Sequence, residues 1–275
     1  MSRQFLHRWF LAVLIGCLSL PLPARAQIVE PDNSDSIHPG SSTQSVPDSS
    51  VDLKQAGQQI FSLTNRFRAQ QGRGELKINA ELSRAAQKFA DYLARTDTFS
   101  HTADGKRPSQ RIREHGYRYC LVAENIAMEY NSAGFTTTAL ARAFVTGWRH
   151  SPEHRKNLLD GDLEDLGVGI ARSKQTGRFY SVQDFGRPKS KAIVFRISNE
   201  ADTTIRYTVD GQSFTLDPHY TAAHTRCRPP ELDLPNARGK GEGTREGEET
   251  FYPKKDTHYV IQGSSRGGYT VEVQR

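Results

Sequence analysis

The hydrophobic period of the chain changes near residue 190, and this change limits the folds available to the chain more than any other feature. Before it, apolar residues recur every three or four positions, which is typical of helices with one buried face. After Ala192 they alternate every second position, as in strands that bury one side. We therefore expect a mixed helix-and-strand domain over residues 51–187 and a small all-β, sandwich-like module over residues 190–275.

Three long amphipathic helices and one short helix are predicted in the first region. The first begins near Leu53, the second follows Asn79 as a suitable N-cap, and the third covers residues 136–148. A short helix is expected over residues 108–115, stopped by Gly116. The expected buried stripes are Leu53, Ala56, Ile60, Leu63 and Phe67; then Leu82, Ala85, Ala86, Phe89, Ala90 and Leu93; then Leu140, Phe144, Val145 and Trp148.

Strands are predicted in both regions. Residues 117–128 lead into a strand that carries Glu124, and residues 166–171 and 178–185 form two more strands joined by a turn. In the second region, Asp210-Gly211 is a strong signal for a β-hairpin. Further strands are expected around residues 193–197, 205–209, 214–216, 258–261 and 269–273, with a Gly-rich, charged loop over 236–249.

The first 26 residues have the pattern of a secretory signal peptide. A basic start and an apolar run of eleven residues precede Ala24-Arg25-Ala26, a cleavage site of the A-x-A form. The run is too short to span a bilayer, which needs about 20 residues. We therefore expect a secreted, extracellular or periplasmic protein, with residues 27–50 as a disordered linker. The alternative is a lipid anchor on Cys17, which ends a lipobox-like segment; cleavage after Ala26 is favoured because apolar residues continue past Cys17.

The basic charge of the chain does not indicate binding to nucleic acid. The formal net charge is +6, but removal of residues 1–26 takes away three arginines and no acid, which leaves +3. A balance this mild is not the electrostatic footprint of a nucleic-acid-binding protein.

If Cys17 is removed with the signal, Cys120 and Cys227 remain. In an oxidising compartment they would either bridge the two regions or stay as separate thiols.

Several polar, reactive residue types lie close together between Trp148 and Leu159. Ser151 and Glu153 suit the N-cap and first turn of a helix that begins at Pro152, and Trp148 suits a core position.

The segment Gly263-Ser264-Ser265-Arg266-Gly267 has the letters of a nucleophile elbow. It lacks the helix that must follow, so we expect a hairpin turn there.

A series of short segments stands in a characteristic order along the first region. They are Asn65-Arg66-Phe67-Arg68, Phe99-Ser100-His101, Gly116-Tyr117, Glu124-Asn125-Ile126, residues 148–159, Leu166-Gly167-Val168-Gly169 and Gln183-Asp184-Phe185-Gly186. In this order they resemble the CAP superfamily of cysteine-rich secretory proteins, insect venom antigens and plant pathogenesis-related proteins, and more narrowly its secreted bacterial branch. The resemblance covers residues 53–186, about half of the chain.

The resemblance implies an α+β fold and a metal-binding cleft. The fold would be an α-β-α sandwich with a small, mostly antiparallel sheet, and the cleft would carry two His and two Glu, which bind zinc in some members. His101, Glu124 and His154 match three of these positions; the fourth is Ser151, which nearby Glu153 cannot simply replace. Two neutral imidazoles and water would make an open site for zinc (Zn2+) or another divalent cation, with no organic cofactor. Hydrogen-bonded structural histidines are the alternative.

Two main classes of function follow for the cleft. The leading hypothesis is a secreted binding protein without enzymatic activity, whose ligand would be a protein, glycan or lipid. The alternative is a metal-dependent, peptidase-like hydrolase with His101 and His154 on the metal and Glu124 as general base. Lipid or sterol binding, which the resemblance also implies, is a third class. Binding is favoured because Ser151 replaces a carboxylate and no nucleophile is recognisable.

Overall fold

The computed structural model describes residues 51–234, 237–240, 250–263 and 268–274. The predicted signal peptide with Cys17, the linker over residues 27–50, most of the loop over 236–249, and residues 264–267 lie outside these ranges. Within them, no helix combines the length and apolar character that crossing a membrane requires.

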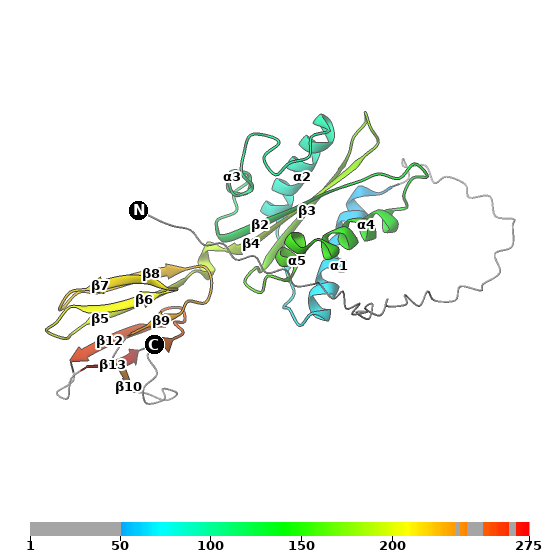
Figure 1. Cartoon of the computed structure of the whole chain (residues 1–275). Helices are drawn as coiled ribbons and strands as arrows, with labels where there is room; N and C mark the ends of the chain where they lie inside the picture. The colour runs from blue at the N-terminus through cyan, green and yellow to red at the C-terminus, as the bar shows by residue number, and fades with distance from the viewer. Residues whose placement is uncertain (1–50, 235–236, 241–249, 264–267, 275) are drawn as a thin grey trace, which may run out of the picture. The chain divides into compact units, whose positions relative to one another are not determined.

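The first region is built around a four-stranded sheet in the order β1-β3-β4-β2 (Figure 1). The strands pair antiparallel, apart from the short parallel pair of β1 with β3. The predicted α+β class and mostly antiparallel sheet are therefore confirmed. In chain order the elements are α1 (Leu53–Gln70), β1 (Lys77–Ile78), α2 (Ala80–Thr96), α3 (Pro108–Glu114), β2 (Tyr119–Glu129), α4 (Thr137–His150), α5 (Pro152–Leu159), β3 (Asp165–Arg172) and β4 (Phe179–Pro188).

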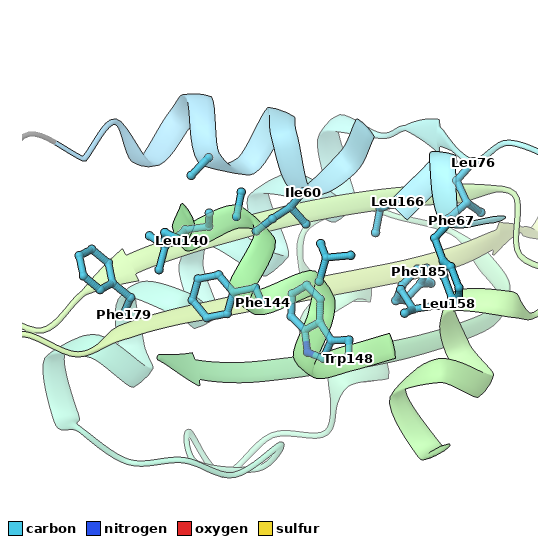
Figure 2. Packing of buried hydrophobic residues seen from close by; sticks show 14 of the residues in the cluster. Ile60, Phe67, Leu76, Leu140, Phe144, Trp148, Leu158, Leu166, Phe179 and Phe185 are labelled. Carbon is cyan, nitrogen blue, oxygen red and sulfur yellow. The ribbon is translucent and has the colours of Figure 1, made fainter. Parts of the chain in front are cut away.

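One face of the sheet packs against α1 and α4. Figure 2 shows Phe144 and Trp148 of α4 together with Ile60 of α1 in this core. Trp148 is 1% exposed, and its indole nitrogen donates a hydrogen bond to the carbonyl oxygen of Ile126 in β2, 3.2 Å away. The core position predicted for Trp148 is therefore confirmed, and its single polar atom is satisfied.

The opposite face packs against α2, whose backbone lies unusually close to the sheet. The side chain of Asn79 caps α2 by accepting a hydrogen bond from the backbone nitrogen of Leu82, as predicted. A Cβ atom added to Gly167 or Gly169 of β3 would lie 2.2 to 2.3 Å from the backbone of α2. Glycine in the strand and alanine in the helix together allow this close approach. The predicted stripe of α2 is fully buried: Leu82, Ala85, Ala86, Phe89, Ala90 and Leu93.

The second region follows the short 3-10 helix η2 (Lys189–Lys191) and contains two sheets that share one apolar core. The first sheet has the order β10-β13-β12-β5-β8 and the second the order β11-β9-β6-β7. The sandwich-like, all-β expectation is confirmed. The strands are β5 (Ile193–Asn199), β6 (Ile205–Val209), β7 (Gln212–Leu216), β8 (Thr221–Arg226), β9 (Leu232–Asp233), β10 (Ala237–Lys240), β11 (Thr250–Phe251), β12 (His258–Gly263) and β13 (Tyr269–Gln274).

The predicted hairpin at Asp210-Gly211 joins β6 to β7. Both residues have positive φ angles, 53° and 75°, as a two-residue hairpin turn of type I′ requires. The elbow-like segment that starts at Gly263 joins antiparallel neighbours β12 and β13, and the next described element after it is a strand rather than a helix. The predicted turn itself falls on residues 264–267, which lie outside the described ranges.

Candidate functional site: a polar cleft

A cavity of about 390 Å³ brings the three predicted cleft residues together. His101 follows α2 in irregular chain, Glu124 lies in β2, and His154 lies in α5. Glu153 also lines the cavity, whereas Ser151 does not. The remaining walls come from Leu121, Val122, Ala123, Lys156, Asn157, Asp160 and Arg228.

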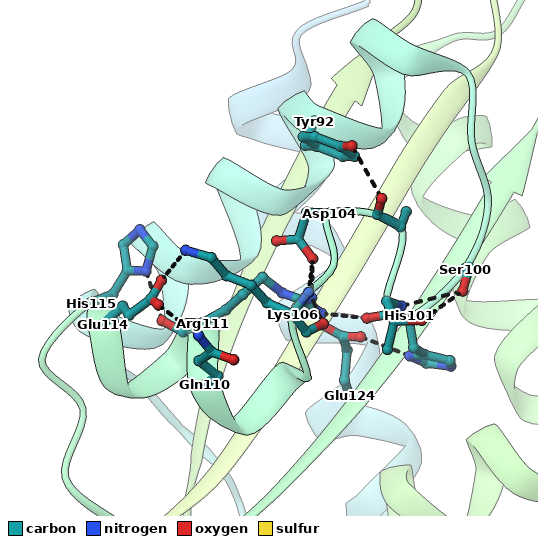
Figure 3. Close-up of polar contacts among 12 residues, drawn as sticks. Tyr92, Ser100, His101, Asp104, Lys106, Gln110, Arg111, Glu114, His115 and Glu124 are labelled. Carbon is teal, nitrogen blue, oxygen red and sulfur yellow. Dashed lines mark hydrogen bonds and ion pairs between the residues drawn. The ribbon is translucent and has the colours of Figure 1, made fainter.

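Glu124 is held on both sides by positively polarised groups. Its side chain is 1% exposed, and its Oε1 lies 2.7 Å from Nδ1 of His101 while its Oε2 accepts a hydrogen bond from Arg111 at 2.6 Å (Figure 3). The imidazole thus has one ring nitrogen fixed on a buried carboxylate. Such a contact sets the tautomer and orientation of a histidine that uses its other nitrogen for binding.

Arg111 is the central residue that the sequence reasoning missed. Its side chain is 5% exposed. The guanidinium carbon lies 3.5 Å from the ring centroid of Phe89, and the group donates hydrogen bonds to Asp104 and to the backbone oxygens of Lys106 and His101. Arg111 therefore supports both Glu124 and the backbone that presents His101. The sequence offered one signal, a basic residue at an inward position of the predicted helix over residues 108–115.

Asp184 is a second residue whose role the sequence reasoning missed. It lies directly opposite Glu124 in the register of β2 and β4, and it is 1% exposed. Neither of its carboxyl oxygens accepts a hydrogen bond from an N–H or hydroxyl group in the described part of the chain. Burial raises the pKa of Asp184 well above its usual value, the charge of Glu124 raises this pKa further, and Arg111 opposes the shift. We therefore assign Asp184 as a neutral acid in the folded protein.

The second histidine of the cleft is kept neutral by its surroundings. Burial lowers the pKa of His154, and the nearby His101 lowers it further, while Glu153 opposes the shift. Amide side chains fix α5 to β2 at this point. Asn125 donates to the backbone oxygen of His154 at 3.3 Å, and Asn157 donates to the side-chain oxygen of Asn125 at 2.9 Å. The imidazole of His154 is therefore available in the form that binds metals.

Ser151 and Glu153 occupy the positions predicted for them at the start of α5. Ser151 is the N-cap residue and Pro152 begins the helix, yet the serine side chain makes no capping hydrogen bond. The N-cap position predicted for Ser151 is therefore confirmed, and its backbone oxygen accepts a hydrogen bond from the backbone nitrogen of Arg155 at 2.8 Å. Glu153 stands in the first turn, as predicted.

The donor set of the cleft suits a weak, open metal site. No group of three or more His, Cys, Asp and Glu side chains in the described ranges is placed to hold a metal ion. The potential ligands are the two imidazoles of His101 and His154, and the carboxylate of Glu124 contacts the Nδ1 atom of His101. Two imidazoles suit zinc among the divalent cations, and water would complete the shell.

A disulfide joins the two regions close to the cleft. Cys120 at the start of β2 is bonded to Cys227, which follows β8, with 5.4 Å between their Cα atoms. The neighbouring Arg228 forms ion pairs with Asp160 and Asp162, each at 2.6 Å. Of the two states expected for the cysteines, the structure has the bridge.

Comparison with known proteins places the similarity in the first region. Residues 61–185 match the model of the cysteine-rich secretory protein family, CAP. The uncharacterised membrane protein YlbC of Bacillus subtilis is 30% identical over 122 residues, which are 44% of this chain and 33% of YlbC. An uncharacterised protein of Borreliella burgdorferi is 26% identical over 119 residues, 42% of this chain and 70% of that protein. The chain thus spans about a third of the length of YlbC.

Two solved structures each align with about half of the chain. An outer surface protein from Borrelia burgdorferi is 24% identical with a TM-score of 0.45, and the alignment covers 50% of this chain and 97% of that one. An extracellular protein containing an SCP domain from Bacillus anthracis is 26% identical with a TM-score of 0.42, covering 49% and 41% of the two chains.

Proposed function

We propose that this chain carries a CAP domain, because residues 61–185 match the model of that family, and that the protein is a binding protein whose cleft holds a divalent cation between His101 and His154. The observation that carries the proposal is the contact between Nδ1 of His101 and Glu124 at 2.7 Å. It leaves Nε2 of His101 as a ligand with a carboxylate behind it, the usual arrangement for zinc-binding histidines.

The surroundings of the cleft support binding rather than hydrolysis. A general base needs a carboxylate that reaches the water it deprotonates. Both oxygens of Glu124 are engaged, by His101 and Arg111, and its side chain is 1% exposed. In this arrangement Glu124 orients His101 and balances the charge of Arg111. The alternative peptidase-like activity would need Glu124 to leave both partners.

Metal content separates the proposal from structural histidines. We expect zinc to co-purify with the wild-type protein under gentle conditions and to be lost from the His101→Ala/His154→Ala variant. A His115→Ala/His150→Ala variant is the matched control, because these histidines hydrogen-bond only to backbone oxygens of their own helices. Equal zinc content in all three proteins would refute the proposal. Peptide hydrolysis that stops with a chelator and with Glu124→Gln would establish the hydrolase instead.

A secreted location is the second part of the proposal. It rests on the predicted signal peptide over residues 1–26, and the Cys120–Cys227 bridge is consistent with an oxidising compartment. We expect the mature chain to begin at Gln27. A chain that begins at a lipid-modified Cys17 would support the lipid anchor. A protein, glycan or lipid partner is expected for such a binding protein.

A further inference from the structure

A second cavity, which shares no lining residue with the polar cleft, lies between α1 and α4. Its volume is about 300 Å³. Half-buried Leu63 and the buried residues Phe67 and Val145 provide apolar lining, and the exposed residues Arg66, Arg142 and Arg149 contribute three guanidinium groups. A cavity of this size accommodates a small molecule rather than a folded partner.

The charge around this cavity is one-sided. Neither α1 nor α4 contains a single Asp or Glu, and no acidic residue lines the cavity. Within the part of the chain that the structure describes, the side chains of Arg66, Arg142 and Arg149 form no ion pair or hydrogen bond. By contrast, Arg226 and Arg228 in the second region are paired with aspartates. The three cations of the cavity are therefore free to bind an anion.

Aromatic stacking helps to hold the cations in place. The guanidinium of Arg149 lies 4.5 Å from the ring centroid of Phe67, and that of Arg155 lies 4.9 Å from the same ring. Arg155 also donates a hydrogen bond to the side chain of Gln71 at 2.9 Å. Stacked guanidinium groups lose less freedom when they bind, and their planar forks match the oxygens of a phosphate group.

We propose that the cavity between α1 and α4 is a binding site for a soluble phosphate ester, with the phosphate on the arginines and a small apolar or ring-shaped group against Leu63, Phe67 and Val145. A soluble ester is favoured over a membrane surface. The cavity is lined by none of the exposed large apolar residues in the described ranges. No apolar side chain is therefore placed here to insert into a bilayer. The proposal is independent of the metal in the cleft.

Calorimetric titration of the mature protein with phenyl phosphate at physiological salt tests the site. We expect binding to the wild type, weakened roughly tenfold or more in Arg66→Gln/Arg142→Gln, because each arginine contributes a charge-assisted hydrogen bond. Arg84→Gln/Arg95→Gln is the matched control, since it removes the same charge from exposed positions on α2 and should bind as the wild type does. Inorganic phosphate should bind more weakly than phenyl phosphate because it leaves the apolar lining unused.

Three outcomes would overturn the proposal. The first is no binding, or equal binding by the Arg66→Gln/Arg142→Gln variant and the wild type. The second is equal weakening in both double variants, which would indicate general charge attraction. The third is arginine-dependent binding to phosphatidylglycerol vesicles that phenyl phosphate does not compete with, which would assign the arginines to a membrane surface. Thermal melting of each variant checks that the fold is intact.

Discussion

At the scale of single residues, Arg111 is the buried counter-ion of Glu124 in the polar cleft. It forms an ion pair with Glu124. Its positive charge also lowers the pKa of the neighbouring buried Asp184, against the larger effect of burial. Sequence reasoning placed His101, Glu124 and His154 in one cleft but gave no role to Arg111 or Asp184. Such contacts depend on which side chains meet across three separate elements, and no local pattern encodes that.

Replacement of Arg111 by methionine should destabilise the fold strongly. The change would leave Glu124 buried without a counter-ion, which costs about 3 kcal/mol or more. We expect a correspondingly lower free energy of unfolding in urea denaturation. Arg111→Lys keeps the charge but loses the planar group that reaches both Asp104 and Glu124. Its free energy of unfolding should therefore lie between those of the wild type and the methionine variant. A loss below about 1 kcal/mol for methionine would show that Arg111 does not balance the buried acids.

Asp184→Asn should change how stability depends on pH. The pKa of Asp184 is raised in the folded state, so the folded chain keeps a proton that the unfolded chain releases. The stability that this proton contributes is fully present below the ordinary pKa of 3.8 and is lost as the pH rises through the folded-state pKa. The asparagine variant lacks this loss. Its free energy of unfolding relative to that of the wild type should therefore rise by about 1.4 kcal/mol per pH unit across that window. Urea denaturation at pH 4.5, 6 and 8 measures the difference. A difference that stays constant with pH would contradict the assignment.

At the scale of elements, the contact between α2 and β3 sets the spacing of the layers. Gly167 and Gly169 lie against the helix backbone, with no room for a methyl group. The sequence predicted the buried stripe of α2 correctly, because its apolar residues recur at the helical period. It did not predict the short strands β9 and β11. Each has only two residues, and the two strands pair with each other across a long stretch of sequence, which a local pattern does not reveal. Strand β8 was also missed, because its polar residues hide the period of two.

Gly169→Ala should therefore be among the most damaging small substitutions. The added Cβ would lie 2.3 Å from the backbone carbonyl carbon of Ala86, so β3 and α2 must separate. We expect a loss of about 3 kcal/mol, within the range for overpacked cores. Gly57→Ala in α1 is the matched control, because its Cβ would lie at an ordinary 4.0 Å from Val168. It should stabilise the helix by up to about 1 kcal/mol. Equal melting temperatures for the two variants would contradict the close-packing account.

At the scale of the whole molecule, the Cys120–Cys227 bridge joins the first region to the β-rich module. It closes a loop with a sequence separation of 107 residues. The sequence suggested this bridge only as one of two options, because pairing requires that two distant segments meet. The module itself was expected from its period of two, yet that pattern says nothing about which surface of the first region it contacts.

Removal of the bridge should lower the stability of the protein without unfolding the core of the first region. A Cys120→Ser/Cys227→Ser variant is expected to lose about 3 kcal/mol, since a bridge restricts the unfolded chain. Intact mass after alkylation should show two modified thiols in the wild type only after reduction, with Cys17 absent from the mature chain. Alkylation of both cysteines without reductant would show that the bridge is not formed. Mutation of Arg228 is a control that breaks the ion pairs with Asp160 and Asp162 and keeps the bridge.

The central claim is that His101 and His154 form one divalent-cation site. Calorimetric titration of chelator-treated protein with zinc tests it most directly, using the wild type, His101→Ala, His154→Ala and the His115→Ala/His150→Ala control. We predict about one zinc per chain for the wild type and the control, and an affinity at least roughly tenfold weaker for each cleft variant. Unchanged zinc affinity in His101→Ala and His154→Ala, with the fold intact, would contradict the account.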